Sequence, residues 1–254
     1  MPTTITKKQI RKPQKQQRPG SEQKMQPKPV FDYPQQKGSN KLLNKIALIT
    51  GGDSGIGKAV AILFAKEGAD IAISYLSEKK DADETKKIIE QQNHKQCLLI
   101  AGDIAKEKHC KELIKKTVAA FGRIDILINN AGLHFENKSL EKISTREMLK
   151  TFETNVFSMF WVTKACLPYM KKGSCIINTA SVTAYRGSSS LMDYAATKGA
   201  IVSFTRSLSS NLIKKGIRVN GVAPGPVWTP LIASSFNSKR VAQHGSNAPM
   251  ERSG

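Results

Sequence analysis

The sequence predicts one α/β domain built on a doubly wound parallel sheet with helices on both faces. From residue 41 onward, short apolar runs that end in turn residues alternate with longer runs of helical spacing. Repeated strand–helix units of this kind form a parallel sheet that is covered on both sides. A glycine-rich turn also joins the first apolar run directly to the first helical run, which is a common opening of doubly wound domains.

Six apolar runs are the expected strands, and a helical stretch follows each of the first five. Right-handed crossovers between them give the Rossmann-type arrangement. The 254 residues suffice for one such domain, which we expect to span residues 41–254. The expected strands are Ile46–Thr50, Ile71–Tyr75, Cys97–Ala101, Ile126–Asn129, Cys175–Asn178 and Arg218–Val222.

Residues 1–40 differ in composition from the rest of the chain. They are rich in Gln, Lys and Pro, and they carry 9 Lys and Arg against 2 Asp and Glu, a net charge of +7. Such a segment buries too little apolar area to offset its ordering entropy. We expect an extended or disordered basic arm that lies on the domain through Val30, Phe31 and Tyr33. An arm that contacts a neighbouring subunit is the alternative.

Composition excludes several classes of protein. No apolar run approaches the roughly 20 residues of a membrane-spanning helix, and the N-terminus lacks the apolar segment of a secretory signal, so a cytoplasmic protein is expected. The net charge of +20 comes with no nucleic-acid-binding motif, so no specific nucleic acid is expected. The four cysteines form no C-x-x-C pair and the four histidines lack metal-ligand spacing, so we expect buried free thiols and no metal site.

The glycine-rich turn between Ile46–Thr50 and the helical run Lys58–Lys66 has the composition of a dinucleotide cradle. Glycine lets the backbone approach a pyrophosphate and lets the helix pack on the strand. The helix N-terminus then offers N–H groups and its positive dipole end to the phosphates. An ordinary strand-to-helix turn is the alternative, and the position after the first strand favours the cradle. Its candidate residues are Gly51, Asp53, Ser54, Gly55, Ile56 and Gly57.

The end of the second expected strand, at Tyr75, leaves the choice between NAD and NADP open. An acidic residue there favours NAD, and a nearby basic residue accommodates the phosphate of NADP. The segment 74–77 contains neither. Lys79 and Lys80 could reach back to a phosphate, whereas Asp53 would oppose it.

Two further loops follow strands on the same side of the expected sheet. Asp103 and Ile104 follow the third strand and could contact an adenine. Asn130, Ala131 and Gly132 follow the fourth strand, where small residues would let the backbone pass close to a ligand. The alternatives are a helix cap for Asp103 and a simple turn for the second loop.

Tyr194 and Lys198 form the candidate catalytic pair. Their i, i+4 spacing places both on one face of a predicted helix. A free tyrosine has a pKa near 10, and a nearby ammonium group would lower the pKa of the phenol. Ser181 ends the fifth strand, and its hydroxyl could hold a substrate oxygen. Because strand ends converge on one crevice, these groups predict proton transfer at an alcohol or carbonyl oxygen while a hydride moves to or from a nicotinamide.

This set of residues resembles the short-chain dehydrogenase/reductase family over residues 11–254. The resemblance implies that Tyr194 is the general acid and base and that Lys198 binds the nicotinamide ribose and tunes Tyr194. It implies that Ser181 orients the substrate oxygen and that Asn155 holds a water of a proton relay. Homotetramers are common in the family. The resemblance also implies a nicotinamide pocket lined by Pro224, Gly225, Val227 and Thr229.

The arm segments 17–20 and 25–29 resemble a bacterial subgroup of general-stress, glucose-dehydrogenase-like oxidoreductases with extended N-termini. Members of the family continue beyond the residues that match 249–254, with another helix and a final strand. We therefore expect an incomplete sheet without its last strand, weak cofactor binding and low activity. The alternative is a short form in which residues 228–254 stay mobile.

Function is therefore expected to be that of an NAD- or NADP-dependent oxidoreductase acting on a carbonyl or secondary alcohol. A non-catalytic cofactor-binding fragment or scaffold is the alternative, and a basic, nucleic-acid-associated stress protein is a third reading. The substrate itself cannot be read from the sequence. The side chains expected to shape its pocket are Leu133, His134, Thr183, Tyr185, Leu191, Trp228 and Leu231.

Overall fold

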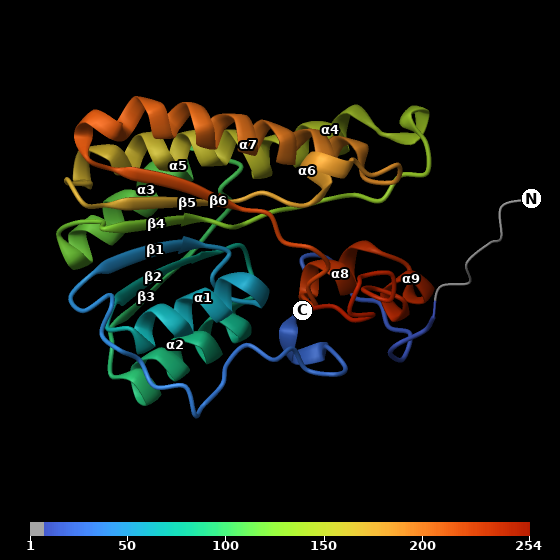
Figure 1. The fold of residues 1–254 in the computed structure, drawn as a ribbon, viewed down its shortest axis with the longest axis horizontal. Helices are drawn as coiled ribbons and strands as arrows, with labels where there is room; N and C mark the ends of the chain where they lie inside the picture. Colours follow the sequence, from blue (N-terminus) through green and yellow to red (C-terminus); the bar gives the residue numbers. More distant parts are fainter. Residues whose placement is uncertain (1–7) are drawn as a thin grey trace, which may run out of the picture.

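Six parallel strands form one sheet in the order β3-β2-β1-β4-β5-β6, in a computed structural model that describes residues 8–254 (Figure 1). The predicted doubly wound sheet is confirmed. The chain moves outward from β1 to β3, returns, and then moves outward in the other direction from β4 to β6, so the switch point lies between β1 and β4. The strands are β1 (Ile46–Thr50), β2 (Asp70–Tyr75), β3 (Cys97–Ala101), β4 (Ile126–Asn129), β5 (Cys175–Thr179) and β6 (Arg218–Val222).

Two strands are one residue longer than the apolar pattern predicts, because pairing with a neighbour decides where a strand ends. Asp70 pairs with Ile46 of β1, and Thr179 pairs with Val222 of β6. Strand β6 forms one edge of the sheet in the described part of the chain, and four of its five residues are exposed.

Helices cover both faces of the sheet (Figure 1). The helices α1 (Gly55–Lys66) and α2 (Lys79–Asn93) pack on one face. The helices α3 (Glu107–Phe121), α4 (Thr145–Phe152), α5 (Ser158–Cys166) and α7 (Met192–Leu212) lie on the other. Shorter elements are η1 (Glu22–Lys24), η2 (Leu140–Lys142), the π-helix η3 (Glu153–Phe157), η4 (Leu167–Tyr169), α6 (Thr183–Arg186), η5 (Ile213–Lys215), α8 (Pro230–Ser235) and α9 (Ser238–Ala242). No helix in residues 8–254 is long and apolar enough to cross a bilayer.

The apolar core is divided by the sheet into two clusters. Leu48 and Ile49 are neighbours in β1 and both are fully buried, but Leu48 belongs to the cluster under α3 and α5, and Ile49 to the cluster under α1. Successive side chains of a strand point to opposite faces, which is why a central strand must be apolar throughout. Each such side chain contributes about 1.5–3 kcal/mol when it is buried.

The arm lies along the domain over residues 8–40. Its attachment differs from the expected one, because Val30 and Tyr33 are 76% and 69% exposed, whereas Glu22 and Met25 are buried. Phe31 does pack on the cluster under α1. The composition argument counted only apolar area, and it therefore omitted the buried carboxylate that ties the arm to the domain.

The last residues fold against the arm rather than extending away from it. In Figure 1, helices α8 and α9 (red) lie beside the first described residues of the arm (blue). Trp228 N–H donates to the carbonyl oxygen of Gly254 at 2.8 Å, and Gly254 N–H donates to that of Pro226 at 2.9 Å. Residues 228–254 therefore form an ordered lobe at the carboxyl ends of the strands.

Candidate active site

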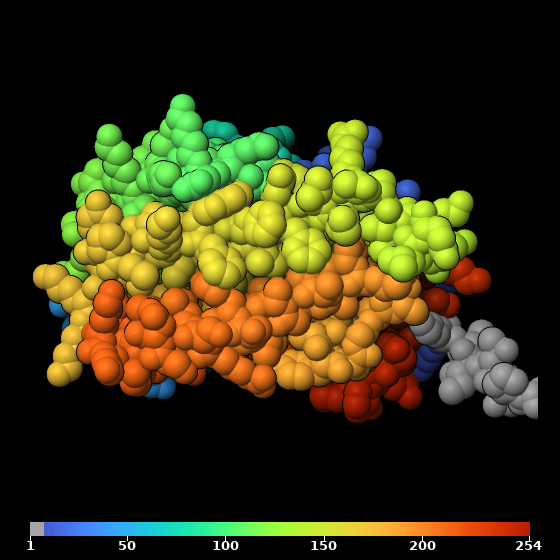
Figure 2. Space-filling model, turned by 90° about the horizontal axis from the view of Figure 1, so that it is seen from above, coloured from blue at the N-terminus to red at the C-terminus, as the bar shows by residue number. Residues whose placement is uncertain are grey.

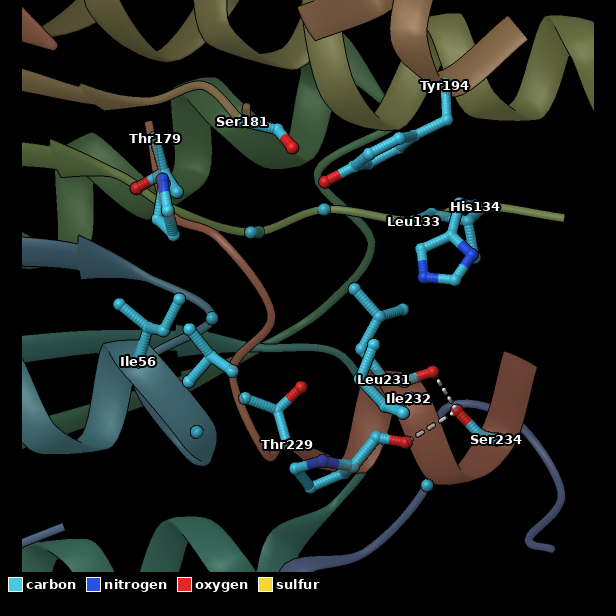
Figure 3. Close-up of a pocket in the computed structure, with 18 of the residues that line it drawn as sticks. Ile56, Leu133, His134, Thr179, Ser181, Tyr194, Thr229, Leu231, Ile232 and Ser234 are labelled. Carbon is cyan, nitrogen blue, oxygen red and sulfur yellow. Dashed lines mark hydrogen bonds between the residues drawn. The ribbon is translucent and has the colours of Figure 1, made fainter. Parts of the chain in front are cut away.

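A cavity of about 830 Å³ lies at the carboxyl ends of the strands (Figure 3). Loops from both sides of the switch point line it, together with the arm and the α8–α9 lobe. All but two of the predicted site residues line this one cavity. They are Gly51, Asp53, Ser54, Gly55, Ile56, Tyr75, Asp103, Ile104, Asn130, Ala131, Gly132, Ser181, Tyr194, Lys198, Pro224, Gly225, Val227 and Thr229.

The glycine-rich turn has the backbone shape that a dinucleotide cradle requires. Gly51 and Gly55 have φ angles of +64° and +53°, and a Cβ atom at Gly55 would lie 2.8 Å from Thr229 Cγ2. Gly57 does not line the cavity, because it packs α1 on the turn, where an added Cβ would lie 1.9 Å from the Gly51 carbonyl oxygen. Asn130 Nδ2 holds the turn by donating to that same oxygen at 3.2 Å. The residues present therefore fit a bound nucleotide.

A carboxylate of the arm caps the first helix. Glu22 Oε2 accepts from Gly55 N–H at 2.8 Å, and Oε1 accepts from Lys58 Nζ at 2.7 Å. Glu22 N–H in turn donates to Asp81 at 2.8 Å. Sequence reasoning missed Glu22, although it is one of only two acidic residues in the basic arm.

The end of the cavity near β2 and β3 is acidic. Burial raises the pKa of Asp53 to about 6, and the neighbouring Asp81 and Glu22 add to this. Burial acts in the same direction on Asp103, but bonds from Lys150 and Ala105 outweigh it and hold the pKa of Asp103 below its ordinary value. Lys79, expected to reach back to a phosphate, instead pairs with Asp83 at 2.5 Å; neither it nor Lys80 lines the cavity.

The Ser181 hydroxyl and the Tyr194 phenol turn toward one another across the cavity (Figure 3). Lys198 Nζ lies 5.3 Å from the centre of the Tyr194 ring and donates to the carbonyl oxygen of Thr179 at 2.7 Å. Burial lowers the pKa of Lys198 to about 8. The three predicted groups are thus brought together at one end of the cavity.

The expected lowering of the Tyr194 pKa does not hold in this structure. Burial raises the pKa of the phenol, and the hydrogen bond with Ser181 only partly opposes it. The ammonium group of Lys198 is directed to a backbone carbonyl beside the ring. At neutral pH the phenol is therefore protonated, as a proton donor must be.

Asn155 is buried in the π-helix η3 and does not line the cavity. Its Oδ1 accepts from Leu133 N–H at 2.7 Å, and its Nδ2 donates to the Leu133 carbonyl at 2.8 Å and to Thr197 Oγ1 at 3.1 Å. The side chain therefore fastens the loop after β4 to α7, the helix that carries Tyr194.

Five of the seven side chains expected to shape the substrate pocket line the cavity: Leu133, His134, Thr183, Leu191 and Leu231. Two do not. Tyr185 is 66% exposed, and Trp228 is buried under the arm, where its Nε1 donates to the Pro27 carbonyl at 2.8 Å. Both residues lie in segments that reach the cavity, but the direction of a side chain in a loop or a short helix depends on packing partners that a local pattern does not contain.

His134 is buried beside Tyr194, and their ring centres are 5.1 Å apart. Burial, together with the positive charges of Arg18, Arg240 and Lys198, lowers the pKa of His134 to about 3. The imidazole is therefore neutral at physiological pH. Sequence reasoning missed the lining residues that come from the arm and the last lobe, which include Arg18, Pro19, Gly20, Phe236, Arg240 and His244.

Comparison with known proteins decides the family. A family model described as short chain dehydrogenase matches residues 45–240. The chain belongs to the short-chain dehydrogenase family. The predicted family and the oxidoreductase class are thereby confirmed.

Relatives within the family support the predicted subgroup. The chain is 57% identical over 249 residues to "Uncharacterized oxidoreductase YhxC" of Bacillus subtilis, with 98% of this chain and 86% of that protein covered. It is 53% identical to "General stress protein 39" of the same species, with coverage of 93% and 82%. It is 50% identical to "NADPH-dependent aldehyde reductase 1, chloroplastic" of Arabidopsis thaliana, with coverage of 93% and 84%.

Solved structures share the fold. A short-chain dehydrogenase from Burkholderia cenocepacia in complex with NADP has a TM-score of 0.78 and 31% identity, with 84% of this chain and 86% of that chain covered. A 3-ketoacyl-(acyl-carrier-protein) reductase from Brucella melitensis complexed with NADH has a TM-score of 0.74 and 32% identity, with the same coverage.

Proposed function

We propose that this protein is an NAD- or NADP-dependent oxidoreductase that interconverts a carbonyl compound and its alcohol, with Tyr194 as general acid and base. The observation that carries the proposal is the convergence of the Tyr194 phenol and the Ser181 hydroxyl on one point of the cavity (Figure 3). The glycine-rich turn that opens into the same cavity supports the cofactor class. Relatives and structural neighbours named for NADPH, NADP and NADH agree with it.

A bound nicotinamide supplies the hydride acceptor or donor. The residues of the chain handle the proton and the geometry. In reduction, Ser181 donates a hydrogen bond that orients the carbonyl oxygen, and Tyr194 gives its proton to that oxygen as the carbon gains a hydride. In oxidation the same proton returns from the alcohol to the phenolate. The raised pKa of Tyr194 favours the protonated phenol and hence the reduction of carbonyl compounds at neutral pH.

Replacement of Tyr194 by Phe tests this assignment. The change removes the proton but keeps the ring, so we expect kcat/KM for aldehyde and ketone reduction to fall by about 10²–10⁴-fold. The dissociation constants for NADH and NADPH, measured by calorimetry, should stay unchanged. Undiminished turnover in the variant would exclude Tyr194 as the acid. Cofactor binding without turnover on any carbonyl by the unchanged protein would favour the non-catalytic alternative.

A homo-oligomer is part of the proposal. An aromatic face is exposed on α5 and α7, where Phe160 is 50% exposed and its ring lies 4.2 Å from that of Phe204. Figure 2 shows this face, with α7 in orange beside α5 in yellow. Exposed apolar patches of this kind mark protein contacts. Light scattering should show an oligomer that Phe160→Glu dissociates, and a monomer in both proteins would refute this part.

A cytoplasmic location completes the proposal. All four cysteines are free and buried, which suits a reducing compartment, where disulfides are rare. Fractionation of cells that produce the tagged chain would test this, and recovery in an extracytoplasmic fraction would contradict it.

A further inference from the structure

The arm forms one wall of the cavity on the side of Tyr194. Arg18, Pro19 and Gly20 line the cavity. Ser234 Oγ of α8 donates to the Pro19 carbonyl at 3.0 Å. At Gly20, which has a φ of +90°, an added Cβ would lie 2.7 Å from the Pro230 carbonyl oxygen. The backbone of the arm is therefore pressed against the α8–α9 lobe.

A buried methionine fixes the next turn of the arm on the same side. Met25 is fully buried in a cluster with Leu191 and Trp228, and Tyr194 packs against this cluster. The position of the arm is thus determined by residues that surround the catalytic phenol, as well as by the Glu22 contact at α1.

The guanidinium group of Arg18 lies in this wall, where the charge of Glu147 acts on it without forming an ion pair. It stacks over the Phe135 ring at 4.0 Å and donates to the His134 carbonyl at 2.8 Å. No ion pair of Arg18 is found in residues 8–254. Arg240, which also lines the cavity, is neutralised by Glu136. An arginine held over an aromatic ring by one such hydrogen bond keeps its other donors for a ligand.

Charges divide the cavity into two ends. The acidic residues that line it, Asp53, Glu78 and Asp103, all follow β1, β2 or β3. Lys150 and Arg240 pair with Asp103 and Glu136. The other cationic residues come from the arm, α6 and α7, and they are Arg18, Arg186 and Lys198.

The positive end reaches the catalytic phenol, because Lys198 Nζ lies 5.3 Å from the centre of the Tyr194 ring. The charge of Arg18 acts on the imidazole of His134, whose ring lies 5.1 Å from that of Tyr194. An anionic group on the substrate would therefore meet a favourable field at this end and an unfavourable one at the other.

We propose that Arg18 of the arm is a substrate-specificity residue that binds an anionic group, a carboxylate or a phosphate, of the carbonyl or alcohol substrate. This inference rests on the proposed oxidoreductase function. A carboxylate or phosphate accepts two parallel hydrogen bonds from a guanidinium group, and the contacts with the Phe135 ring and the His134 carbonyl restrain the position of that fork. The arm is then a part of the substrate pocket.

Paired probes that differ only in the anion test the proposal. They are 4-oxobutanoate against butanal for a carboxylate, and glyceraldehyde 3-phosphate against glyceraldehyde for a phosphate. We expect the unchanged protein to have the higher kcat/KM for the charged member of at least one pair, and that pair identifies the anion. Arg18→Gln should reduce the charged-to-neutral ratio by about 10–100-fold, as expected for the loss of a charge-assisted bond. Arg18→Lys, which keeps the charge but loses the fork, should lie between.

Arg11→Gln is the matched control. Arg11 is also an arm arginine that stacks on an aromatic ring, that of Trp228 at 4.1 Å, and donates to a backbone carbonyl, that of His244 at 2.8 Å. It does not line the cavity, so its replacement should leave the charged-to-neutral ratio unchanged. Equal changes of the ratio in both glutamine variants, or preference of the unchanged protein for the neutral member of both pairs, would overturn the proposal.

Binding without turnover separates this proposal from the proposed function. Succinate and inorganic phosphate, titrated by calorimetry into the unchanged protein and into the Arg18 and Arg11 variants, report anion binding directly. Weaker binding of either anion in Arg18→Gln alone supports the proposal even if no probe is turned over, in which case the oxidoreductase assignment fails instead. Equal binding in all variants, or no binding of either anion, overturns it.

Discussion

Replacing Glu22 by Gln should loosen the arm and destabilise the whole domain. The Glu22 carboxylate accepts from Gly55 N–H and from the ammonium group of Lys58, and both charged side chains are almost fully buried. Glutamine has one acceptor oxygen, so one of these bonds is lost and an NH₂ group then faces a donor. Lys58 keeps only its 3.4 Å contact with the more exposed Glu84 and the ring of Phe31.

The expected size of the effect follows from these contacts. Removal of one partner of a buried ion pair costs about 3–5 kcal/mol, and the remaining contacts of Lys58 offset part of this. We therefore expect the free energy of unfolding to fall by about 2–4 kcal/mol, consistent with one lost charge-assisted bond of about 1.5–3 kcal/mol. The double variant Glu22→Gln/Lys58→Met should be more stable than Glu22→Gln alone, because it leaves no unpaired buried charge.

Urea unfolding followed by tryptophan fluorescence is the assay. Trp228 is a useful probe because its Nε1 binds the arm at Pro27. Trypsin provides a second readout, since the bond after Lys24, next to the buried Met25, becomes accessible when the arm is released. Glu107→Gln is the control, because its pair with Lys111 is exposed and should contribute less than about 1 kcal/mol. If Glu22→Gln unfolds at the same urea concentration as this control and trypsin cuts both at the same rate, the ion pair does not hold the arm.

Three further changes test the cavity. Asp53→Asn should raise the free energy of unfolding above pH 6 by roughly 1–3 kcal/mol, because the raised pKa of about 6 means that ionised Asp53 destabilises the fold. In melting experiments at different pH values, this gain should vanish near pH 4. A stability difference that stays the same across this range would contradict the prediction. Lys198→Met should lower kcat/KM by about 10²–10⁴-fold. It should not lower the melting temperature at pH 7, because it removes a buried ammonium group whose pKa is lowered to about 8, and any gain in stability should shrink above pH 8. A clear drop in melting temperature at pH 7 would contradict this prediction. Gly57→Ala should destabilise the domain by about 1–3 kcal/mol and weaken NADPH binding, since the added Cβ would overlap the Gly51 carbonyl. If the variant keeps the same melting temperature and the same calorimetric dissociation constant for NADPH, the turn can shift to accept the methyl group.

The sheet and the cradle were predictable because their signals are contiguous in the sequence. Strand β1 is buried at every residue, and its sequence is therefore an apolar run. The glycines that shape the cradle follow this run directly. Helical spacing also placed Tyr194 and Lys198 correctly on one face of α7. Helical spacing could not show that the ammonium group of Lys198 binds the Thr179 carbonyl. The expected lowering of the Tyr194 pKa was wrong for that reason, and because burial of the phenol raises its pKa.

The contribution of the arm was not predictable from local patterns. Arg18 meets a residue 116 positions away and Glu22 meets Lys58 across 36 positions. In the sequence, Arg18 is one of many basic residues in a proline-rich segment. Only the tertiary structure places its guanidinium group at the cavity, against His134 and Phe135 of the loop after β4.

The π-helix Glu153–Phe157 connects two distant parts of the molecule. The wider turn directs Asn155 inward to the backbone of Leu133, while Phe157, two residues later, is 41% exposed and its ring centre lies 6.0 Å from that of Trp161. A second subunit that covered Phe157 would brace the turn that sets the loop beside the reacting groups. Association and turnover would then be mechanically linked, so that dilution below the assembly threshold would lower the specific activity of each subunit.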